Sequence, residues 1–284
     1  MVKFKAYLLL LLFLCKASAT LATQQSPPKV VALAPHLVEL IFEIGAGRQI
    51  IGVSQYSDFP EDAKDIPVVG DYQSLNIEKI VALQPDLIIV WQTGHPVKDV
   101  EKLKALGFQV AYSDPRSISD VPQELIKLGR LLGKQSLAET KAAELTTALD
   151  NIQQQYAHKK PVKVFYELWP DPLSTIGASS WPSSILALCG AYNVFDDITN
   201  NPYPQVNIEQ VLARKVDLII QPLSDNQSAK SGFQWQNWPD IKAVKHNQII
   251  QPDADKLHRM TSRAVEQVAE LCGQIDNVRL FYQS

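Results

Sequence analysis

Residues 76–89 read NIEKIVALQPDLII, and residues 207–220 read NIEQVLARKVDLII. The two stretches are identical at eight of fourteen positions, and each joins a helical segment to an apolar run rich in isoleucine. They lie about one domain length apart, which is too far for the period of a solenoid. The sequence therefore predicts two similarly built lobes, each with a short helix that runs into a buried strand.

Predicted strands and helices alternate around both copies. Apolar runs rich in β-branched residues predict strands at 29–34, 50–54, 87–91, 109–113, 163–168, 218–222 and 248–252. Helical spacing predicts helices at 36–47, 97–107, 181–188 and 261–278, besides the two that begin at Ile77 and Ile208. Strands that alternate with helices indicate an α/β fold with a parallel sheet in each lobe, flanked by helices.

The middle of the chain differs, because residues 119–160 show no strand pattern. Residues 121–134 and 136–160 have helical spacing, and the second stretch contains neither glycine nor proline. A helix of about 25 residues is roughly 37 Å long and acts as one long rigid connection, not as a flexible linker. We therefore predict an N-terminal lobe at 23–120, a helical segment with the connecting helix at 121–160, and a C-terminal lobe at 161–284.

The first 22 residues predict a secretory signal peptide. Lys3 and Lys5 precede an apolar run at 6–14, and small residues follow it. A run this short does not span a bilayer as a helix. The small residues place the predicted cleavage at Ala19 or Ala22.

The exported chain is mildly acidic. Residues 1–22 contain three lysines and no acidic residue, so the net charge of −3 becomes −6 without them. Phosphate binding needs a basic surface, which argues against nucleic acid as a partner.

Two cysteines, Cys189 and Cys272, remain after export. An even count in an exported protein favours a disulfide, and two cysteines allow only one intramolecular bond. The alternative is a pair of buried free thiols.

Sequence motifs of catalysis and metal binding are sparse. Gly45, Gly47 and Gly52 follow a helix and precede a strand, which is the reverse of the order in a dinucleotide-binding fingerprint. No metal site is predicted, because no H-x-x-x-H or C-x-x-C spacing occurs. A site that three histidines from both lobes form together is the alternative; the histidines are His36, His95, His158, His246 and His258. We predict no catalytic residue and no enzymatic activity, and an exported enzyme of unknown reaction is the alternative from a different class.

Aromatic residues cluster where α/β sheets place their ligands, just past the strand ends. Tyr56, Trp91 and Trp169 lie at strand ends, and Tyr72 and Tyr203 lie four residues before the asparagine of each repeat copy. Rigid aromatic rings suit a flat, partly apolar ligand at low entropic cost. Core packing is the alternative for any one ring, but the group predicts a ligand site in the cleft between the lobes.

Glu78 and Glu209 occupy the same position in the two repeat copies. Asn76 and Asn207 suit helix N-caps, and a carboxylate in the first helical turn is stabilised by about 0.3–1 kcal/mol. Stabilisation of the helix start is enough to explain one such glutamate, but it does not explain why both lobes have it at the same position. Two carboxylates on the rims of two lobes also predict an acidic docking pair for a two-fold basic partner.

Taken together, these stretches resemble the periplasmic substrate-binding proteins of ABC importers that have a rigid helical backbone, and within them the cobalamin-binding branch. The similar stretches are VVALAPHLVELIFEIGAG, IIGVSQYSDFP, LNIEKIVALQPDLIIVW, YPQVNIEQVLAR and the two cysteines. The resemblance implies a periplasmic protein, monomeric when free, with a paired Cys189 and Cys272 and a ligand between two lobes.

The resemblance also implies a ligand and a partner. Cobalamin or a related corrinoid is expected against Tyr56, Tyr72, Trp91 and Tyr203, with Asp255 at its edge. A phenylalanine contact of the family is not matched, because Leu168 stands there beside Trp169. Glu78 and Glu209 are expected to dock on arginines of the dimeric membrane permease.

Haem or an iron siderophore on the same scaffold is the alternative ligand. Haem iron usually takes a His or Tyr axial ligand. Tyr56, Tyr72 and His36 are the candidates for that ligand in this sequence.

Overall fold

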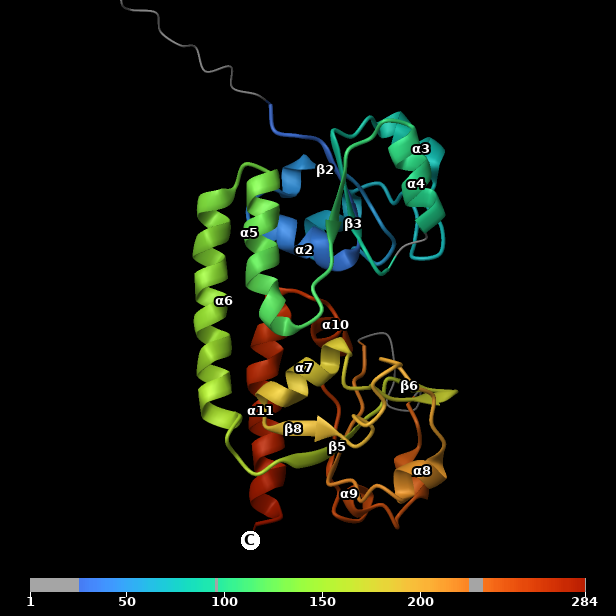
Figure 1. Ribbon diagram of the computed structural model, residues 1–284, viewed down its shortest axis with the longest axis vertical. Helices are drawn as coiled ribbons and strands as arrows, with labels where there is room; N and C mark the ends of the chain where they lie inside the picture. The colour runs from blue at the N-terminus through green and yellow to red at the C-terminus, as the bar shows by residue number, and fades with distance from the viewer. Residues whose placement is uncertain (1–25, 95–96, 225–231, 284) are drawn as a thin grey trace, which may run out of the picture.

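The computed structural model describes residues 26–94, 97–224 and 232–283, and the predicted signal peptide at 1–22 lies outside the described residues. Within those ranges, no helix is long and apolar enough to cross a membrane. The chain forms two α/β lobes, one above the other in Figure 1, and a long helix runs along one side of both.

The N-terminal lobe is built on a parallel sheet with the strand order β2-β1-β3-β4. Its strands are β1 (Val30–Leu33), β2 (Ile50–Val53), β3 (Leu87–Trp91) and β4 (Val110–Ser113), and its helices are α2 (Pro35–Glu43), α3 (Ile77–Leu83) and α4 (Val97–Ala105). Val30 and Ala32 face the core that contains α2, whereas Val31 and Leu33 face α3 and α4. Strand β1 is apolar throughout because helices cover both faces of the sheet.

The C-terminal lobe repeats this plan with a parallel sheet in the order β10-β9-β5-β8. Its strands are β5 (Val162–Tyr166), β8 (Ala191–Asn193), β9 (Leu218–Ile220) and β10 (Ile249–Ile250), and its helices are α7 (Trp181–Leu188), α8 (Ile208–Leu212), α9 (Lys242–Lys245), α10 (Ala254–Leu257) and α11 (Ser262–Phe281). The sequence did not predict strand β8, the antiparallel ribbon of β6 (Trp169–Pro170) and β7 (Leu173–Ser174), or the short helix α10. The three missed strands, WP, LS and AYN, do not lie in apolar runs of the length that predicts a strand.

Helices α5 (Val121–Leu131) and α6 (Gln135–Tyr156) connect the two lobes, as the sequence predicts. The 22 residues of α6 correspond to about 33 Å. The helix ends at Tyr156, short of the predicted 160, and a turn follows before Pro161. Proline disfavours helical conformation in the residue before it, so the helix does not extend to Lys160.

A single apolar core joins this helical segment to both lobes. Its members include Leu37 and Ile41 of α2, Leu125 and Leu128 of α5, Leu149 and Ile152 of α6, and Val268 and Leu271 of α11. Moving one lobe against the other would expose part of this core at a cost of roughly 25 cal/mol per Å². The packing therefore favours a fixed orientation of the lobes.

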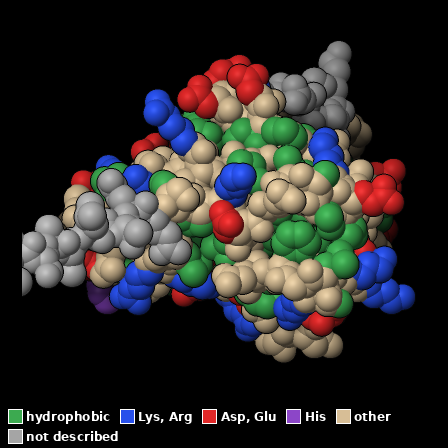
Figure 2. Space-filling model, turned by 90° about the horizontal axis from the view of Figure 1, so that it is seen from above, with side chains coloured by type: hydrophobic (Ala, Val, Ile, Leu, Met, Phe, Trp, Pro, Cys, Tyr) green, Lys and Arg blue, Asp and Glu red, His purple; other side chains and the backbone are tan. Residues whose placement is uncertain are grey.

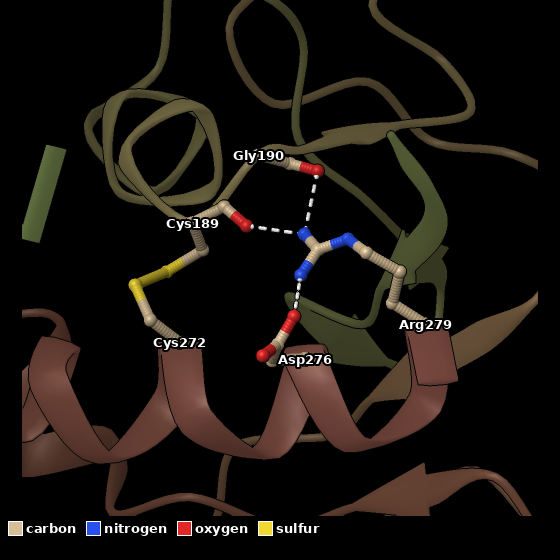
Figure 3. The surroundings of a disulfide bond; sticks show 5 residues. All are labelled: Cys189, Gly190, Cys272, Asp276 and Arg279. Carbon is tan, nitrogen blue, oxygen red and sulfur yellow. Dashed lines mark hydrogen bonds and ion pairs between the residues drawn. A yellow bond between two sulfur atoms is a disulfide. The ribbon is translucent and has the colours of Figure 1, made fainter. Parts of the chain in front are cut away.

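Cys189, which caps α7, and Cys272 of α11 form the predicted disulfide, and both are fully buried. Beside the bond, the guanidinium of Arg279 donates hydrogen bonds to the carbonyl oxygens of Cys189 and Gly190, at 2.7 and 3.1 Å, and pairs with Asp276 (Figure 3). The disulfide and this arginine fasten the last helix to the end of α7.

The end of the molecule at the N-terminal lobe has a mixed surface. Figure 2 shows acidic and basic side chains interspersed with exposed hydrophobic ones, and no continuous basic area on the part of this face formed by described residues.

Candidate functional site

A cavity of about 670 Å³ lies between the lobes, beyond the carboxyl ends of strands from both sheets. The N-terminal lobe contributes Pro35 after β1, and Tyr56 and Asp58 after β2. The C-terminal lobe contributes residues that follow β5, β9 and β10: Glu167, Leu168, Trp169, Pro170, Pro222, Leu223, Ser224, Gly232, Ala254, Asp255, His258 and Arg259. Open α/β sheets place their ligands at this position.

Three of the predicted ligand residues meet in this cavity, namely Tyr56, Trp169 and Asp255. Each lobe supplies one large aromatic ring, and both rings are exposed, Tyr56 at 65% and Trp169 at 57% of their surface. The backbone of Tyr56 has φ of +66°, which is uncommon for an aromatic residue. Asp255 lies in the first turn of α10.

Tyr72, Trp91 and Tyr203 do not line this cavity. Tyr72 and Tyr203 are exposed, at 64% and 46%. Trp91 is partly buried and packs edge-on against His36, with ring centroids 5.5 Å apart and an interplanar angle of 88°. Contact between these three residues and a ligand stays a prediction.

The lining of the cavity includes a buried carboxylate, Glu167, that the sequence did not point to. Glu167 follows β5 and accepts hydrogen bonds from the indole nitrogen of Trp235 at 2.6 Å, from Gln221 at 2.8 Å and from the backbone of Phe233 at 2.9 Å. Burial raises the pKa of Glu167, and these three donors oppose the rise. The carboxylate therefore holds the segment around Phe233 against β5. The position of Glu167 directly after a predicted strand was the sequence feature that could have indicated it as a site residue.

His258 is the second polar group that was missed as a cavity residue. One ring nitrogen, Nε2, lies 2.9 Å from the hydroxyl of the buried Tyr166. Burial lowers the pKa of His258 to about 4, so its imidazole is neutral near pH 7. Burial, with a smaller contribution from Tyr203, raises the pKa of Tyr166. His258 therefore presents a neutral hydrogen-bonding group to the cavity, with Tyr166 behind it.

An ion pair crosses the cavity edge from one lobe to the other. Arg259 lies 2.7 Å from Asp58, measured from Nη1 to Oδ1. Burial alone would raise the pKa of Asp58, but the hydrogen bond and charge of Arg259 outweigh it and lower the pKa. No local sequence pattern links these residues, since they lie in different lobes.

Glu78 and Glu209 lie outside the cavity, at equivalent positions in α3 and α8. Asn76 and Asn207 cap these helices, each accepting a backbone hydrogen bond at 2.9 Å three residues further on. Both glutamates are exposed, and neither forms an ion pair with another described residue. The two helices lie on the side of the molecule away from α6, one in each lobe (Figure 1).

Among the residues that the structure describes, no group of three or more His, Cys, Asp or Glu side chains is placed to hold a metal ion. His95, one of the scattered histidines, lies outside the described residues. A second hollow, of about 710 Å³, lies beside 26–28 and the turn between α5 and α6, and no predicted ligand residue lines it. The cavity between the lobes is therefore the candidate site.

Comparison with known proteins indicates the family of this chain. A family model described as periplasmic binding protein matches residues 30–255. The chain is 36% identical to the vitamin B12-binding protein of Vibrio vulnificus (strain CMCP6) over 276 residues, which are 95% of this chain and 97% of that protein. The crystal structure of the periplasmic vitamin B12 binding protein BtuF of Vibrio cholerae matches with a TM-score of 0.82 at 33% identity, over 89% of this chain and 98% of that one.

Haem-binding proteins share the fold at lower identity. The periplasmic heme-binding protein RhuT from Roseiflexus sp. RS-1 matches with a TM-score of 0.77 at 21% identity, over 89% of this chain and 99% of that one. The resemblance found in the sequence is confirmed by the family model and by relatives more than 30% identical over nearly the whole chain. The chain belongs to the periplasmic binding protein family.

Proposed function

We propose that this protein captures cobalamin, or a related corrinoid, between its lobes and delivers it to an ABC import permease. The observation on which this rests is the cavity at the strand ends, where each lobe exposes one aromatic ring, Tyr56 and Trp169. Relatives named vitamin B12-binding proteins, 33% to 36% identical over most of the chain, support the choice of ligand.

The two exposed rings provide affinity for a large, flat ligand. An aromatic side chain buries 150–250 Å², so covering the exposed part of each ring contributes roughly 2–3 kcal/mol. Polar groups at the cavity wall, such as Asp255 and His258, then orient the amide groups at the rim of a corrin. Most of the affinity is expected from the rings and the selectivity from the polar wall.

Titration with cyanocobalamin tests the ligand. Isothermal calorimetry should show saturable binding of one ligand per chain at micromolar concentration or below. Y56A and W169A should each weaken binding by about 30- to 150-fold, because each loses roughly 2–3 kcal/mol of buried aromatic contact.

Y192A is the matched control for these variants, since Tyr192 is an exposed aromatic residue of β8 that does not line the cavity. It should bind like the wild type. Absence of saturable binding by the wild type would refute the proposed ligand.

Haem is the second candidate ligand, because Tyr56 exposes a phenol in the cavity that could serve as an axial ligand. The absorption spectrum of the protein mixed with haem separates the two ligands. A Soret band typical of axial tyrosine ligation, lost in the conservative variant Y56F, would favour haem. An unchanged spectrum of free haem would favour the corrinoid.

We also propose that Glu78 and Glu209 dock on basic residues of a dimeric permease. Both carboxylates are exposed at the start of equivalent helices, and their charge is not balanced by an ion pair among the described residues. The E78A/E209A variant should keep its affinity for cyanocobalamin and lower uptake by the reconstituted importer at least tenfold, because two charge contacts are lost.

The control for docking is E101A/E270A, which removes two exposed glutamates of α4 and α11. Uptake should stay at the level of the wild type. Loss of ligand binding in E78A/E209A would instead assign these residues to the ligand site.

The remaining features of the proposal follow from this role. Residues 1–22 direct export and are removed, and the protein works in the periplasm as a monomer without catalytic activity. The division into lobes at 23–120 and 161–284, joined by 121–160, matches a ligand site assembled from both.

A further inference from the structure

A buried carboxylate of the N-terminal lobe is held by two arginines of the C-terminal lobe. Glu39, in α2, is 5% exposed. Arg263 of α11 donates two hydrogen bonds to it, each 2.9 Å long, and Arg259 donates a third at 2.8 Å. Charge-assisted and bidentate bonds of this kind are strong and fix geometry.

The same contacts extend to the ligand cavity. Arg259 lines the cavity, pairs with Asp58 and donates a hydrogen bond of 3.4 Å to the backbone oxygen of Tyr56. Glu39 itself does not line the cavity. We name Glu39, Asp58, Arg259 and Arg263 the inter-lobe ion cluster. It contains two acidic and two basic side chains, so its formal charge is balanced.

Tyr56 needs support from outside its own loop. Its φ of +66° is in the left-handed region, which a residue with a Cβ occupies only when surrounding contacts enforce it. Its ring is largely exposed, so packing of the side chain provides little of this enforcement. The bond from Arg259 to its backbone oxygen, together with the Arg259–Asp58 pair two residues later, provides part of it.

Two further contacts strengthen the same junction. The guanidinium of Arg263 lies 3.8 Å from the centroid of the Phe59 ring, and the hydroxyl of Ser262 is hydrogen-bonded to Glu43. Residues 259–263 of the C-terminal lobe therefore contact both α2 and the loop after β2 of the N-terminal lobe.

We propose that Glu39 is a positioning residue for the ligand site. Through Arg259 it fixes the spacing of the lobes and the conformation of Tyr56, so that the cavity is formed before the ligand arrives. A preformed site does not spend binding energy on ordering its own side chains. The inference on ligand affinity rests on the proposed corrinoid function, whereas the inference on lobe spacing does not.

The variant E39Q tests the proposal, because glutamine keeps the shape of the side chain and removes its charge. Binding of cyanocobalamin should weaken about tenfold or more, since immobilising side chains on binding then becomes a cost. The distribution of distances between spin labels at A82C and A213C, measured by pulsed electron resonance, should broaden. Ala82 and Ala213 are exposed and occupy equivalent positions in the two repeat copies.

D276N is the matched control. Asp276 also bridges two cations, Lys159 and Arg279, but all three residues lie away from the junction between the lobes. This variant should lose thermal stability while it keeps the affinity and the distance distribution of the wild type. If D276N and E39Q change the ligand affinity and the distance distribution equally, Glu39 contributes only to the general stability of the protein.

The outcomes separate this proposal from the proposed function. Unchanged affinity and unchanged distances in E39Q would overturn the positioning role. If the wild type does not bind cyanocobalamin, the corrinoid function fails, and the distance distribution still decides whether Glu39 fixes the lobes. Should E39Q not fold, R263K removes the bidentate arm without altering the cavity lining, and broadened distances with weaker binding are expected there as well.

Discussion

Replacing both Cys189 and Cys272 with alanine is expected to lower the free energy of unfolding by about 4.5 kcal/mol. The disulfide joins residues separated by 83 positions, and closure of so long a loop removes much of the entropy of the unfolded chain. The double variant should therefore unfold at a clearly lower urea concentration than the oxidised wild type. Binding of cyanocobalamin should persist at 25 °C, because neither cysteine lines the cavity.

The reduced wild-type protein is the control for this variant. It lacks the bond but keeps both sulfur atoms in the core. The difference in free energy of unfolding between the reduced protein and the double variant therefore measures the packing of the sulfur atoms alone. The contacts of Arg279 with Cys189 and Gly190 remain in both. If reduction leaves the unfolding midpoint of the wild type unchanged, the disulfide does not stabilise the fold.

Much of the fold was predictable because its signals are local. Helix α7 begins and ends at the predicted residues, since Ser180 caps it, Pro182 lies in its first turn and Gly190 follows its end. The two repeat copies likewise predicted α3, α8, β3 and β9. The short elements β6, β7 and β8 were missed, because pairing with neighbouring strands decides their conformation more than their own sequence does.

The site was predictable only in part. The positions of Tyr56 and Trp169 at strand ends predicted them as ligand residues. Asp255 was predicted from the family resemblance. The contacts of Glu39 with Arg259 and Arg263 span at least 220 residues of chain, and in α2 the glutamate stands among apolar residues. Such a pair becomes visible only once the lobes are assembled, because no helical or strand period links its members.

Between pH 7 and pH 4, the ligand-free protein is expected to lose about 2–3 kcal/mol of stability through His258 alone. Burial lowers the pKa of this imidazole from 6.5 to about 4. In the unfolded chain the ring takes up a proton below about pH 6.5, whereas in the folded protein it does so only near pH 4. The unfolded state therefore binds more protons in this window, so the contribution is fully present above pH 6.5 and is lost as the pH falls towards 4.

The variant H258Q isolates this contribution. Glutamine does not titrate and can keep a hydrogen bond to the hydroxyl of Tyr166. Urea unfolding at a series of pH values should therefore show that H258Q loses less stability towards pH 4 than the wild type. Groups with a raised pKa, such as Glu43 and Glu167, titrate in both proteins and cancel in the comparison. H158Q, at an exposed histidine after α6, should retain the wild-type profile. Parallel profiles for H258Q and the wild type would show that the partly buried imidazole does not cause the acid sensitivity.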